Sequence, residues 1–471
     1  MSEPTSRRAP VMADLVVDDP YTSEEAARRP LADEREVDQV LDQARAASRS
    51  WGETPVAERV ALCERAIAQM EGASDAIALD ITRMMGKPFR QAKNEVAGMA
   101  KRARHMCTIA EASLADVVLP PLSGFERRIV RAPLGVVLNL PAWNYPLLTA
   151  VNVVVPAVLA GNAVVLKHST RSALCGEHFA DAFARAGAPE HVVQALHCDH
   201  ATSERMVGDP RVGYVAFTGS VQGGHKLYAA TAAKHFIDVG LELGGKDPAY
   251  VAPDADLDKA VDGLVDGACY NAGQSCCGVE RVYVHASLHD RFVEAALAQV
   301  RAYKLGDPKS EGTSMGPMAQ PNAPRFLEEQ VAQASSRGAR VLCGGKATKV
   351  AGRGRFFEPT LLVDAGADLD VMRLESFGPV LPVVRVESDE EALALMNDSD
   401  LGLTASVWTR DRDRAARMAS KLETGTVYMN QCDTLDPGLP WTGVKDSGKG
   451  STLSALGFMH LTRPKSYNFK L

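Results

Sequence analysis

The segments Glu-Leu-Gly-Gly-Lys at residues 242–246 and Gly-Gln-Ser-Cys-Cys-Gly at residues 273–278 organise the interpretation of this chain. The stretch between them is long enough for one helix and its connections. A carboxylate can serve as a general base and a cysteine thiolate as a nucleophile, and neighbouring glycines leave room for a ligand. We therefore expect Glu242 and Cys276, each in a glycine-rich loop, to form the reactive pair of an enzyme.

On the N-terminal side of this pair, short apolar segments alternate with helical patterns. The expected buried strands are residues 135–140, 163–167, 192–196, 212–217 and 235–239, with helices at 146–159, 172–186 and 220–232. This alternation predicts a parallel sheet covered by helices on both faces, as in dinucleotide-binding domains. Its ligand is expected at the carboxyl ends of the strands.

The first part of the chain is predicted to be mostly helical. Residues 1–20 are polar and are interpreted as an arm. Residues 125–132 carry charges on both faces, which indicates an exposed strand or a strand used in assembly. Apolar side chains recur at helical spacing in four stretches, residues 34–50, 55–70, 73–85 and 89–112.

After Gly245 the alternation of strands and helices starts again. The expected helices are residues 256–271, 287–304 and 389–396, and the expected strands are near 281–284, 361–363, 381–384 and 405–408; the domain is expected to end near residues 426–430. This pattern predicts a second α/β domain. The tail from Trp441 to Leu471 is first rich in glycine and then polar.

Composition limits the class of protein. With 471 residues, 46% hydrophobic and 24% charged, the chain is long enough for two or three globular domains. A net charge of −7 and a pI near 5.9 argue against a nucleic acid or an anionic membrane as partner. The longest apolar stretch, residues 147–159, is too short to span a bilayer. Nine cysteines without CxxC spacing, and no secretion signal, indicate reduced thiols in a cytoplasmic protein.

Two other segments look like ligand-binding motifs but lack side chains that those motifs require. Residues 240–246 have the glycine and lysine spacing of a phosphate-binding loop, but Asp247 stands where that loop needs a hydroxyl group. Residues 254–258 suggest a calcium loop, but Lys259 and Val265 occupy the positions that need glycine and glutamate. The histidines also lack metal-ligand spacing, so we expect no metal site.

Six motifs, each weak alone, occur in one order along the chain. They are Pro-Ala-Trp-Asn-Tyr-Pro at 141–146, Phe-Thr-Gly-Ser at 217–220, Glu-Leu-Gly-Gly-Lys at 242–246, Gly-Gln-Ser-Cys at 273–276, Glu-Ser-Phe-Gly-Pro at 375–379 and Gly-Val-Lys-Asp-Ser-Gly at 443–448. In this order and spacing the sequence resembles the aldehyde dehydrogenase superfamily, over most of its length.

The resemblance implies two Rossmann-like α/β domains and a small strand-based oligomerisation arm. Residues 1–114 and 134–244 would form the dinucleotide-binding domain, and residues 245–440 the catalytic domain that carries the cysteine. Residues 115–133 and 441–471 would be the strands that join subunits. A homodimer, or a homotetramer built from two dimers, is the expected assembly.

The resemblance also implies a reaction, the NAD(P)⁺-dependent oxidation of an aldehyde. Cys276 would attack the aldehyde carbonyl, while the side-chain amide of Asn144 and the backbone N–H of Cys276 stabilise the oxyanion. Hydride transfer to the cofactor would leave a thioester, and Glu242 would activate the water that hydrolyses it. Two alternatives stay open: an acylating enzyme that passes the thioester to coenzyme A, and a catalytically retired binding or structural protein of the same fold.

For the cofactor, the resemblance implies that Lys167 binds the adenosine ribose and that Glu375 binds the nicotinamide ribose. The remaining implied contacts are Pro141, Trp143, Thr170, Gly219, Ser220, Gly224, Leu243 and Phe377. NAD-preferring relatives usually carry a glutamate three positions after the lysine, where this chain has Thr170. A short neutral side chain there does not repel a 2′-phosphate, and Lys167, helped by Arg171, could attract it, so we expect NADP⁺ to be accepted.

The substrate pocket is expected on one face of the helix that follows Asn144. Tyr145, Leu148 and Asn152 share that face by their spacing. By resemblance Tyr270, Ser275 and Cys277 also line the pocket, beside the nucleophile. The partly polar lining favours a small functionalised aldehyde or a semialdehyde.

Overall fold

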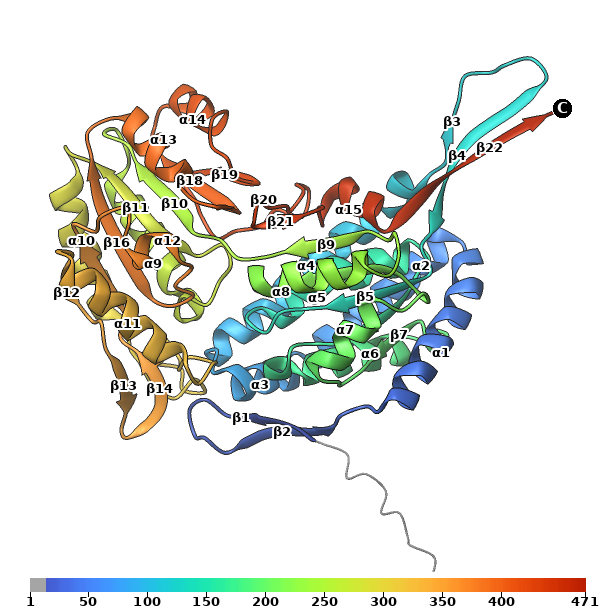
Figure 1. Ribbon diagram of the computed structural model, residues 1–471, viewed down its shortest axis with the longest axis horizontal. Helices are drawn as coiled ribbons and strands as arrows, with labels where there is room; N and C mark the ends of the chain where they lie inside the picture. Colours follow the sequence, from blue (N-terminus) through green and yellow to red (C-terminus); the bar gives the residue numbers. More distant parts are fainter. Residues whose placement is uncertain (1–13) are drawn as a thin grey trace, which may run out of the picture.

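A computed structural model describes residues 14–471, and its two largest sheets are each covered by helices (Figure 1). The first sheet has the strand order β21-β9-β8-β5-β6-β7, and every pair is parallel except β21 with β9. Its strands are β5 (Val136–Leu140), β6 (Ala163–Leu166), β7 (Val193–Ala195), β8 (Val212–Thr218), β9 (Val239–Glu242) and β21 (Gly448–Lys449). The prediction of a helix-covered parallel sheet is confirmed.

Helices bury both faces of this sheet. They are α1 (Glu34–Glu53), α5 (Pro146–Leu159), α6 (Leu174–Arg185), α7 (His200–Val207) and α8 (Val221–Ala232). Successive residues of a strand point to opposite faces. Val137 of β5 therefore packs in the same core as α5, whereas its neighbours Val136 and Leu138 pack with α1.

The predicted helical front end is confirmed. It consists of α1, α2 (Val56–Gly72), α3 (Ser74–Met85) and α4 (Phe89–Leu114), and α4 packs against α2 and α5. The start of α1 is set by a capping box: Asp33 accepts the N–H of Glu36, and Glu36 accepts the N–H of Asp33. No helix formed by residues 14–471 combines the length and apolar character needed to cross a membrane.

The second sheet has seven strands in the order β12-β15-β16-β11-β10-β18-β19, antiparallel only between β12 and β15. They are β10 (Asp247–Val251), β11 (Val279–His285), β12 (Arg340–Cys343), β15 (Thr360–Val363), β16 (Val380–Val386), β18 (Thr404–Trp408) and β19 (Thr426–Met429). The helices here are α9 (Leu257–Cys269), α10 (His289–Ala302), α11 (Ala323–Ser336), α12 (Asp370–Arg373), α13 (Asp389–Asn397) and α14 (Arg412–Ala419). The prediction of a second α/β unit is confirmed, although β10, β12, β19, α11, α12 and α14 were not predicted.

Two details of the sequence-based prediction are wrong. The strand expected at residues 235–239 is β9, which runs from Val239 to Glu242, because Phe236 is exposed while Val239 and Leu241 point into the core. Glu242 is therefore the last residue of a strand and not part of a glycine-rich loop. The polar arm expected over residues 1–20 contains strand β1 (Asp14–Asp18), which forms a hairpin with β2 (Glu25–Pro30); residues 1–13 lie outside the described part of the chain.

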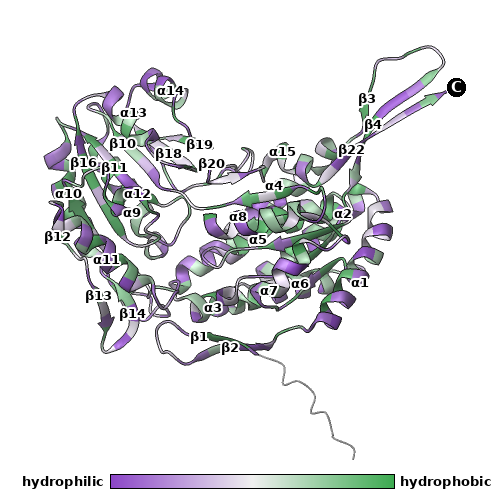
Figure 2. Cartoon of the chain, in the orientation of Figure 1, coloured by the Kyte–Doolittle hydropathy of each residue, from purple (hydrophilic) through white to green (hydrophobic). Residues whose placement is uncertain are grey.

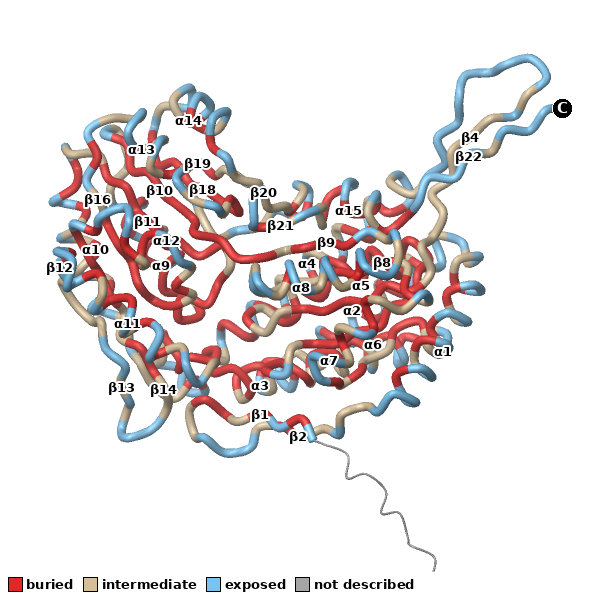
Figure 3. Tube along the Cα trace, in the orientation of Figure 1, coloured by how far each residue is buried: buried red, intermediate tan, exposed pale blue. Residues whose placement is uncertain are grey.

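A three-stranded sheet projects from the body beside the C-terminus (Figure 1). Strand β4 (Phe125–Pro133) pairs along its whole length with β22 (Thr462–Lys470), and β3 (Val117–Val118) adds to its other edge. Figure 3 shows intermediate residues along β4 and mostly exposed ones along β22, in contrast to the buried strands of the two main sheets. Figure 2 shows hydrophobic and hydrophilic residues mixed along these strands, and Val117, Val118 and Phe469 are exposed. The predicted strand-based arm is present; the domain boundaries and its use in assembly stay predictions.

The β1–β2 hairpin links the two halves of the chain through Asp18. The carboxylate of Asp18 pairs with Arg171, which follows β6, and with Arg355 of β14 (Arg353–Phe357), at 2.5 Å from Arg355 Nη1. Burial raises the pKa of Asp18, but the hydrogen bond from Arg355 and the charge of Arg171 outweigh it, so this pKa lies below the ordinary 3.8. Asp18 is therefore ionised in the folded protein at neutral pH.

Replacing Asp18 with Asn should lower the free energy of unfolding at pH 7 by about 1–2 kcal/mol, since a buried guanidinium loses its charged partner while Asp18 itself stays partly exposed. Because the native pKa is depressed, the stabilisation exists above the unfolded-state pKa and is lost as the pH falls below it. Urea unfolding of both proteins at pH 7 and at about pH 3 measures this.

The matched control is Asp14→Asn, whose carboxylate pairs with exposed Arg28 on the same hairpin, and it should change the unfolding free energy by less than about 0.5 kcal/mol. Equal effects of the two substitutions at pH 7 would contradict the bridging role of Asp18.

Candidate active site

Cys276 lies where two cavities meet. One cavity of about 590 Å³ and another of about 640 Å³ are both lined by Cys276, Asn144 and Thr218. Glu242 lines the first cavity, and the cleft at the carboxyl ends of the first sheet forms the second. A thiol at such a junction can contact one molecule from each side, so the geometry suits transfer between a substrate and a dinucleotide.

The loop that presents Cys276 is held in an unusual backbone conformation. It follows α9 and the short 3₁₀ segment η2 (Tyr270–Gly273), in which Asn271 and Ala272 have φ values of 54° and 56°. Gly273 also has a positive φ, and a Cβ at this position would lie 2.3 Å from the carbonyl oxygen of Gly378. The Gln274 side chain closes the loop, since its amide nitrogen donates to the Asn271 carbonyl and its oxygen accepts the N–H of Ala319.

Asn144 is buried at the same junction. Its side-chain nitrogen donates to the Gln274 carbonyl over 3.2 Å, and it makes no capping hydrogen bond to α5. Its own carbonyl accepts from Lys87 Nζ over 2.8 Å and from Asn271 Nδ2 over 3.1 Å. An amide nitrogen has two N–H groups, so Asn144 can donate one more hydrogen bond to an oxygen bound beside Cys276.

A buried ion pair supports Asn144. Lys87 Nζ lies 2.5 Å from Glu95 of α4, and the other oxygen of Glu95 accepts the N–H of Leu147 in the first turn of α5 over 2.8 Å. Both side chains are almost completely buried, and burial lowers the pKa of Lys87. This pair was not found by sequence reasoning, although the Gly-Lys-Pro break between α3 and α4 carries the lysine.

Glu242 is held by the C-terminal part of the chain. The Oγ1 of Thr452 donates to Glu242 Oε1, because β21 pairs antiparallel with β9 and brings the tail beside the strand end. Burial raises the pKa of Glu242 from 4.5 to about 7, against the hydrogen bond from Thr452 and the positive charge of Arg102. A carboxyl group with this pKa can accept a proton near neutral pH. Sequence reasoning did not single out Thr452.

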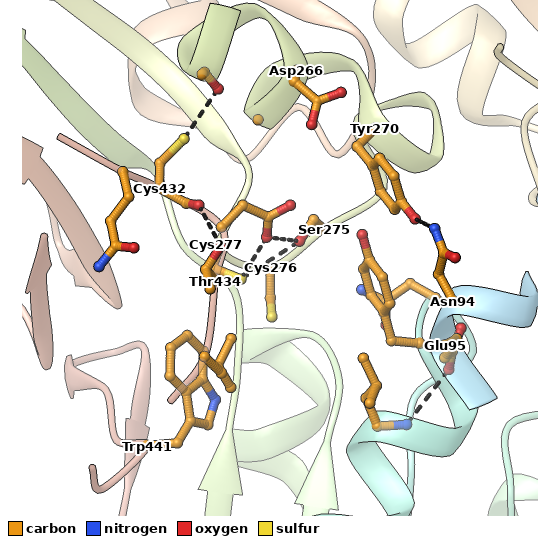
Figure 4. A pocket seen from close by; sticks show the side chains of 18 of the residues that line it. Asn94, Glu95, Asp266, Tyr270, Ser275, Cys276, Cys277, Cys432, Thr434 and Trp441 are labelled. Carbon is orange, nitrogen blue, oxygen red and sulfur yellow. Dashed lines mark hydrogen bonds between the residues drawn. The ribbon is translucent and has the colours of Figure 1, made fainter. Parts of the chain in front are cut away.

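A second acid, Asp433, lies directly behind the nucleophile loop. Its Oδ1 accepts hydrogen bonds of 3.0 Å from both Ser275 Oγ and Cys277 Sγ, and burial raises its pKa from 3.8 to about 6. The neighbouring Cys276 thiol and burial raise the pKa of Cys277 well above its ordinary value. Ser275 and Cys277 are thus turned toward Asp433. In Figure 4 the sulfur of Cys276 points instead into the cavity.

All six residues predicted for the substrate pocket line the cavity that contains Glu242. They are Tyr145, Leu148, Asn152, Tyr270, Ser275 and Cys277. Figure 4 shows Tyr270 on one side of Cys276 and Trp441 on the other, with Asn94 donating to the Tyr270 hydroxyl over 3.4 Å. Sequence reasoning missed Trp441, Asp433 and Arg102 because they come from elements distant in the chain.

Eight of the ten predicted cofactor residues line the other cavity. They are Pro141, Trp143, Lys167, Gly219, Ser220, Leu243, Glu375 and Phe377. Gly224 lies beneath it, where a Cβ would come within 2.8 Å of the Leu243 side chain, so it permits close packing. Thr170 is exposed in the 3₁₀ turn η1 (Thr170–Ser172), and its neighbour Ser169 lines the cavity in its place.

The cleft fits the parts of a dinucleotide. Ser220 caps α8 by accepting the N–H of Gly223, so the start of this helix faces the cleft and offers backbone N–H groups to a pyrophosphate. At the other end Trp143 and Phe377 pack edge to face at 5.4 Å, a surface for a flat ring. Burial raises the pKa of Glu375 to about 8, with nearby Glu280 acting in the same direction.

The two cations expected near the adenosine, Lys167 and Arg171, have different surroundings. Lys167 is buried in the cleft without an ion-pair partner among residues 14–471, and burial lowers its pKa. Arg171 is turned away and bound to Asp18, so its expected contribution to cofactor binding is wrong. Lys226 of α8 also lines the cleft, paired with Glu204 at 2.9 Å, and it was not predicted.

Comparison with known proteins agrees with this geometry. The model of the aldehyde dehydrogenase family matches residues 10–467. A succinate-semialdehyde dehydrogenase [NADP(+)] of Deinococcus radiodurans is 37% identical, with 95% of this chain and 93% of that protein covered. The succinate semialdehyde dehydrogenase [NAD(P)+] Sad of Escherichia coli is 35% identical over 93% of this chain and 94% of its own.

Solved structures show the same similarity. The lactaldehyde dehydrogenase of Escherichia coli superimposes with a TM-score of 0.93 at 31% identity, and the alignment covers 99% of this chain and 97% of that one. The predicted fold class and activity class, NAD(P)⁺-dependent aldehyde oxidation, are therefore confirmed. The chain belongs to the aldehyde dehydrogenase family.

Proposed function

We propose that the enzyme oxidises a small functionalised aldehyde of the semialdehyde class to its carboxylic acid, through a thioester on Cys276 that water hydrolyses. The observation that carries this proposal is the position of Cys276, whose thiol lies at the junction of the cavity with Glu242 and the dinucleotide cleft. NAD(P)⁺ bound in the cleft supplies the hydride acceptor. Support for the substrate class comes from the partly polar cavity and from the semialdehyde dehydrogenases among the relatives.

In the first step the Cys276 thiolate attacks the aldehyde carbonyl carbon and the carbonyl oxygen becomes an oxyanion. The free N–H of the Asn144 side chain stabilises this charge. Lys87 and Asn271 hold the Asn144 backbone through its carbonyl, so the amide is already in place when the charge develops. Loss of the hydride from carbon then leaves the thioester.

In the second step Glu242 accepts a proton from the water that attacks the thioester, which releases the acid and restores the thiolate. The raised pKa of Glu242 suits this exchange, since the carboxylate binds the proton readily and gives it up near neutral pH. An acylating enzyme would have no use for such a base. A coenzyme A requirement for turnover would favour that alternative.

We further propose that the three-stranded arm joins subunits into a homodimer or homotetramer. Strands β3, β4 and β22 expose Val117, Val118 and Phe469 far from the main cores. Exposed apolar side chains on a projecting sheet support a contact with a second copy of the chain.

Replacing Cys276 with Ala should abolish reduced-cofactor formation, because no covalent intermediate can form. Replacing Glu242 with Gln should retain a first burst of about one reduced cofactor per active site and slow the steady state by about 10²–10⁴-fold. Stopped-flow absorbance at 340 nm separates the two phases. Cys343→Ala, which changes a thiol outside both cavities, is the control; an unaltered steady state in Glu242→Gln would remove this base from the mechanism.

The rate of thioester hydrolysis should rise with pH through about 7, since only ionised Glu242 accepts a proton and burial raises its pKa to about 7. Thr452→Val removes a hydrogen bond that stabilises the carboxylate, so the rise should move to higher pH by about one pH unit. Thr452→Ser keeps the hydroxyl and should keep the wild-type profile. Superimposable profiles of the valine variant and wild type would be incompatible with this role.

NADP⁺ should be a good cofactor, because the position three residues after Lys167 carries Thr170 and not a carboxylate, and Lys167 has no ion-pair partner among residues 14–471. Thr170→Glu should lower kcat/KM for NADP⁺ by at least about 10-fold and leave that for NAD⁺ within about 3-fold, since only the 2′-phosphate is repelled. Thr170→Gln is the neutral control of similar size. A wild-type preference for NAD⁺ above about 100-fold would refute this prediction.

A further inference from the structure

Arg102 is a half-buried cation in the lining of the cavity that holds Cys276, and it forms no ion pair with any group of residues 14–471. It extends from α4 into the cavity lining, where its Nη1 donates to the Asn152 side-chain oxygen over 3.2 Å and to the Leu148 carbonyl over 3.4 Å. Its Nε and Nη2 donate to no group among residues 14–471. No carboxylate in that part of the chain comes within 4.0 Å of it.

The other charged side chains of the cavity each have a protein partner. Glu95 is paired with Lys87, and Glu242 accepts from Thr452. Asp433 accepts from Ser275 and Cys277, and Lys259 pairs with Asp256 at 3.6 Å in a largely exposed position. Arg102 therefore differs from its neighbours: it lines the cavity, and two of its nitrogen atoms donate to no group of residues 14–471.

Burial of an unpaired guanidinium costs free energy unless an anion approaches it. A guanidinium also matches a carboxylate by offering two parallel N–H donors, which makes it selective for this group. Here Nη1 is already fixed by Asn152 and Leu148, so the free donors are held in one orientation. An incoming carboxylate would meet a pre-organised site.

The position of Arg102 sets the length of the molecule that could reach it. The guanidinium contacts the carbonyl of Leu148 in the first turn of α5, a helix that begins two residues after Asn144. Asn144 lines the same cavity beside Cys276. A chain of a few carbon atoms can thus place an aldehyde at the thiol and a carboxylate at Arg102.

We propose that Arg102 binds the terminal carboxylate of a short ω-carboxylated aldehyde while its carbonyl carbon is presented to Cys276. This inference rests on the proposed aldehyde oxidation and names its substrate class. Asn152 acts as a positioning residue that orients the guanidinium. The acids at the cavity opening, Asp262 and Asp266, are exposed, so solvent screens their repulsion of an anionic substrate.

The main alternative to this proposal is a preference for a positively charged substrate. A cationic aminoaldehyde could use Asp433 or the acids at the opening, but Asp433 already accepts two hydrogen bonds and Arg102 would face a like charge. The structure therefore favours the anionic substrate. Comparing aldehydes of one length and different charge distinguishes the two.

The experiment measures kcat/KM with NADP⁺ for succinate semialdehyde, butanal and 4-aminobutanal, which share a four-carbon chain and differ at the far end. Wild-type enzyme should prefer succinate semialdehyde. Arg102→Gln should lower kcat/KM for that substrate by about 10²–10³-fold and change the value for butanal by less than about 3-fold. Arg102→Lys keeps the charge but loses the paired donors, so its kcat/KM for succinate semialdehyde should lie between those of wild type and Arg102→Gln.

The charge of Arg102 also lowers the pKa of Glu242. Each variant is therefore judged by the ratio of kcat/KM for succinate semialdehyde to kcat/KM for butanal, because an effect on hydrolysis changes both values and cancels in the ratio. The matched control is Arg104→Gln, two residues along α4, whose side chain pairs with Glu71 on the outer surface and should leave both substrates unchanged. Succinate as a product inhibitor gives a second readout, and its inhibition constant should rise at least about 10-fold in Arg102→Gln.

Several outcomes would overturn the assignment of Arg102. One is an equal loss of kcat/KM for succinate semialdehyde and butanal in Arg102→Gln. The others are an unchanged preference of that variant for succinate semialdehyde over butanal, and a preference of the wild-type enzyme for 4-aminobutanal. Wild-type oxidation of butanal without oxidation of succinate semialdehyde would overturn the substrate class alone. Absence of oxidation of all three aldehydes with either cofactor would instead remove the proposed function.

Discussion

The hydrogen bonds to the Asn144 carbonyl oxygen hold the active site together. Lys87, just before α4, and Asn271, in the loop before Cys276, both donate to this one oxygen. A segment that follows the first sheet, a helix from the front end and a loop of the second half thus meet in a buried polar contact. Buried polar groups are costly without partners, so loss of one member leaves the others unsatisfied. The relative position of the thiol and the amide is fixed by this requirement.

Burial controls the electrostatics of the cavity next to this contact. It raises the pKa of Glu242 and of Asp433, and a different partner stabilises each carboxylate, Thr452 for the first and Ser275 with Cys277 for the second. The Lys87–Glu95 pair is neutral as a whole. Arg102 lines this cavity without an ion-pair partner among residues 14–471, and its positive charge opposes the rise in the pKa of Glu242. Substrate charge and the proton affinity of Glu242 are therefore coupled through one guanidinium.

Both ends of the chain return to stabilise this arrangement. The N-terminal hairpin bridges Arg171 and Arg355 through Asp18, and the C-terminal tail supplies Thr452 to Glu242 before it continues into the arm. The tail strand β21 pairs with β9 directly at the residue that carries the carboxylate. A contact that joins subunits through β22 would thus lie on the same segment as the partner of Glu242.

The sequence by itself determined the helices of the front end, the two alternating α/β patterns and the residues Asn144, Glu242 and Cys276, because these depend on local periodicity and on short motifs. Residues on one helix face, such as Tyr145, Leu148 and Asn152, followed from spacing alone. Only the tertiary structure decided which distant side chains join them. Arg102, Asp433 and Thr452 reach the site through helix packing, a loop and an antiparallel edge strand, and Arg171 is diverted to Asp18. Short sequence patterns do not predict such contacts, because these contacts form between segments that lie far apart in the sequence and meet only on folding.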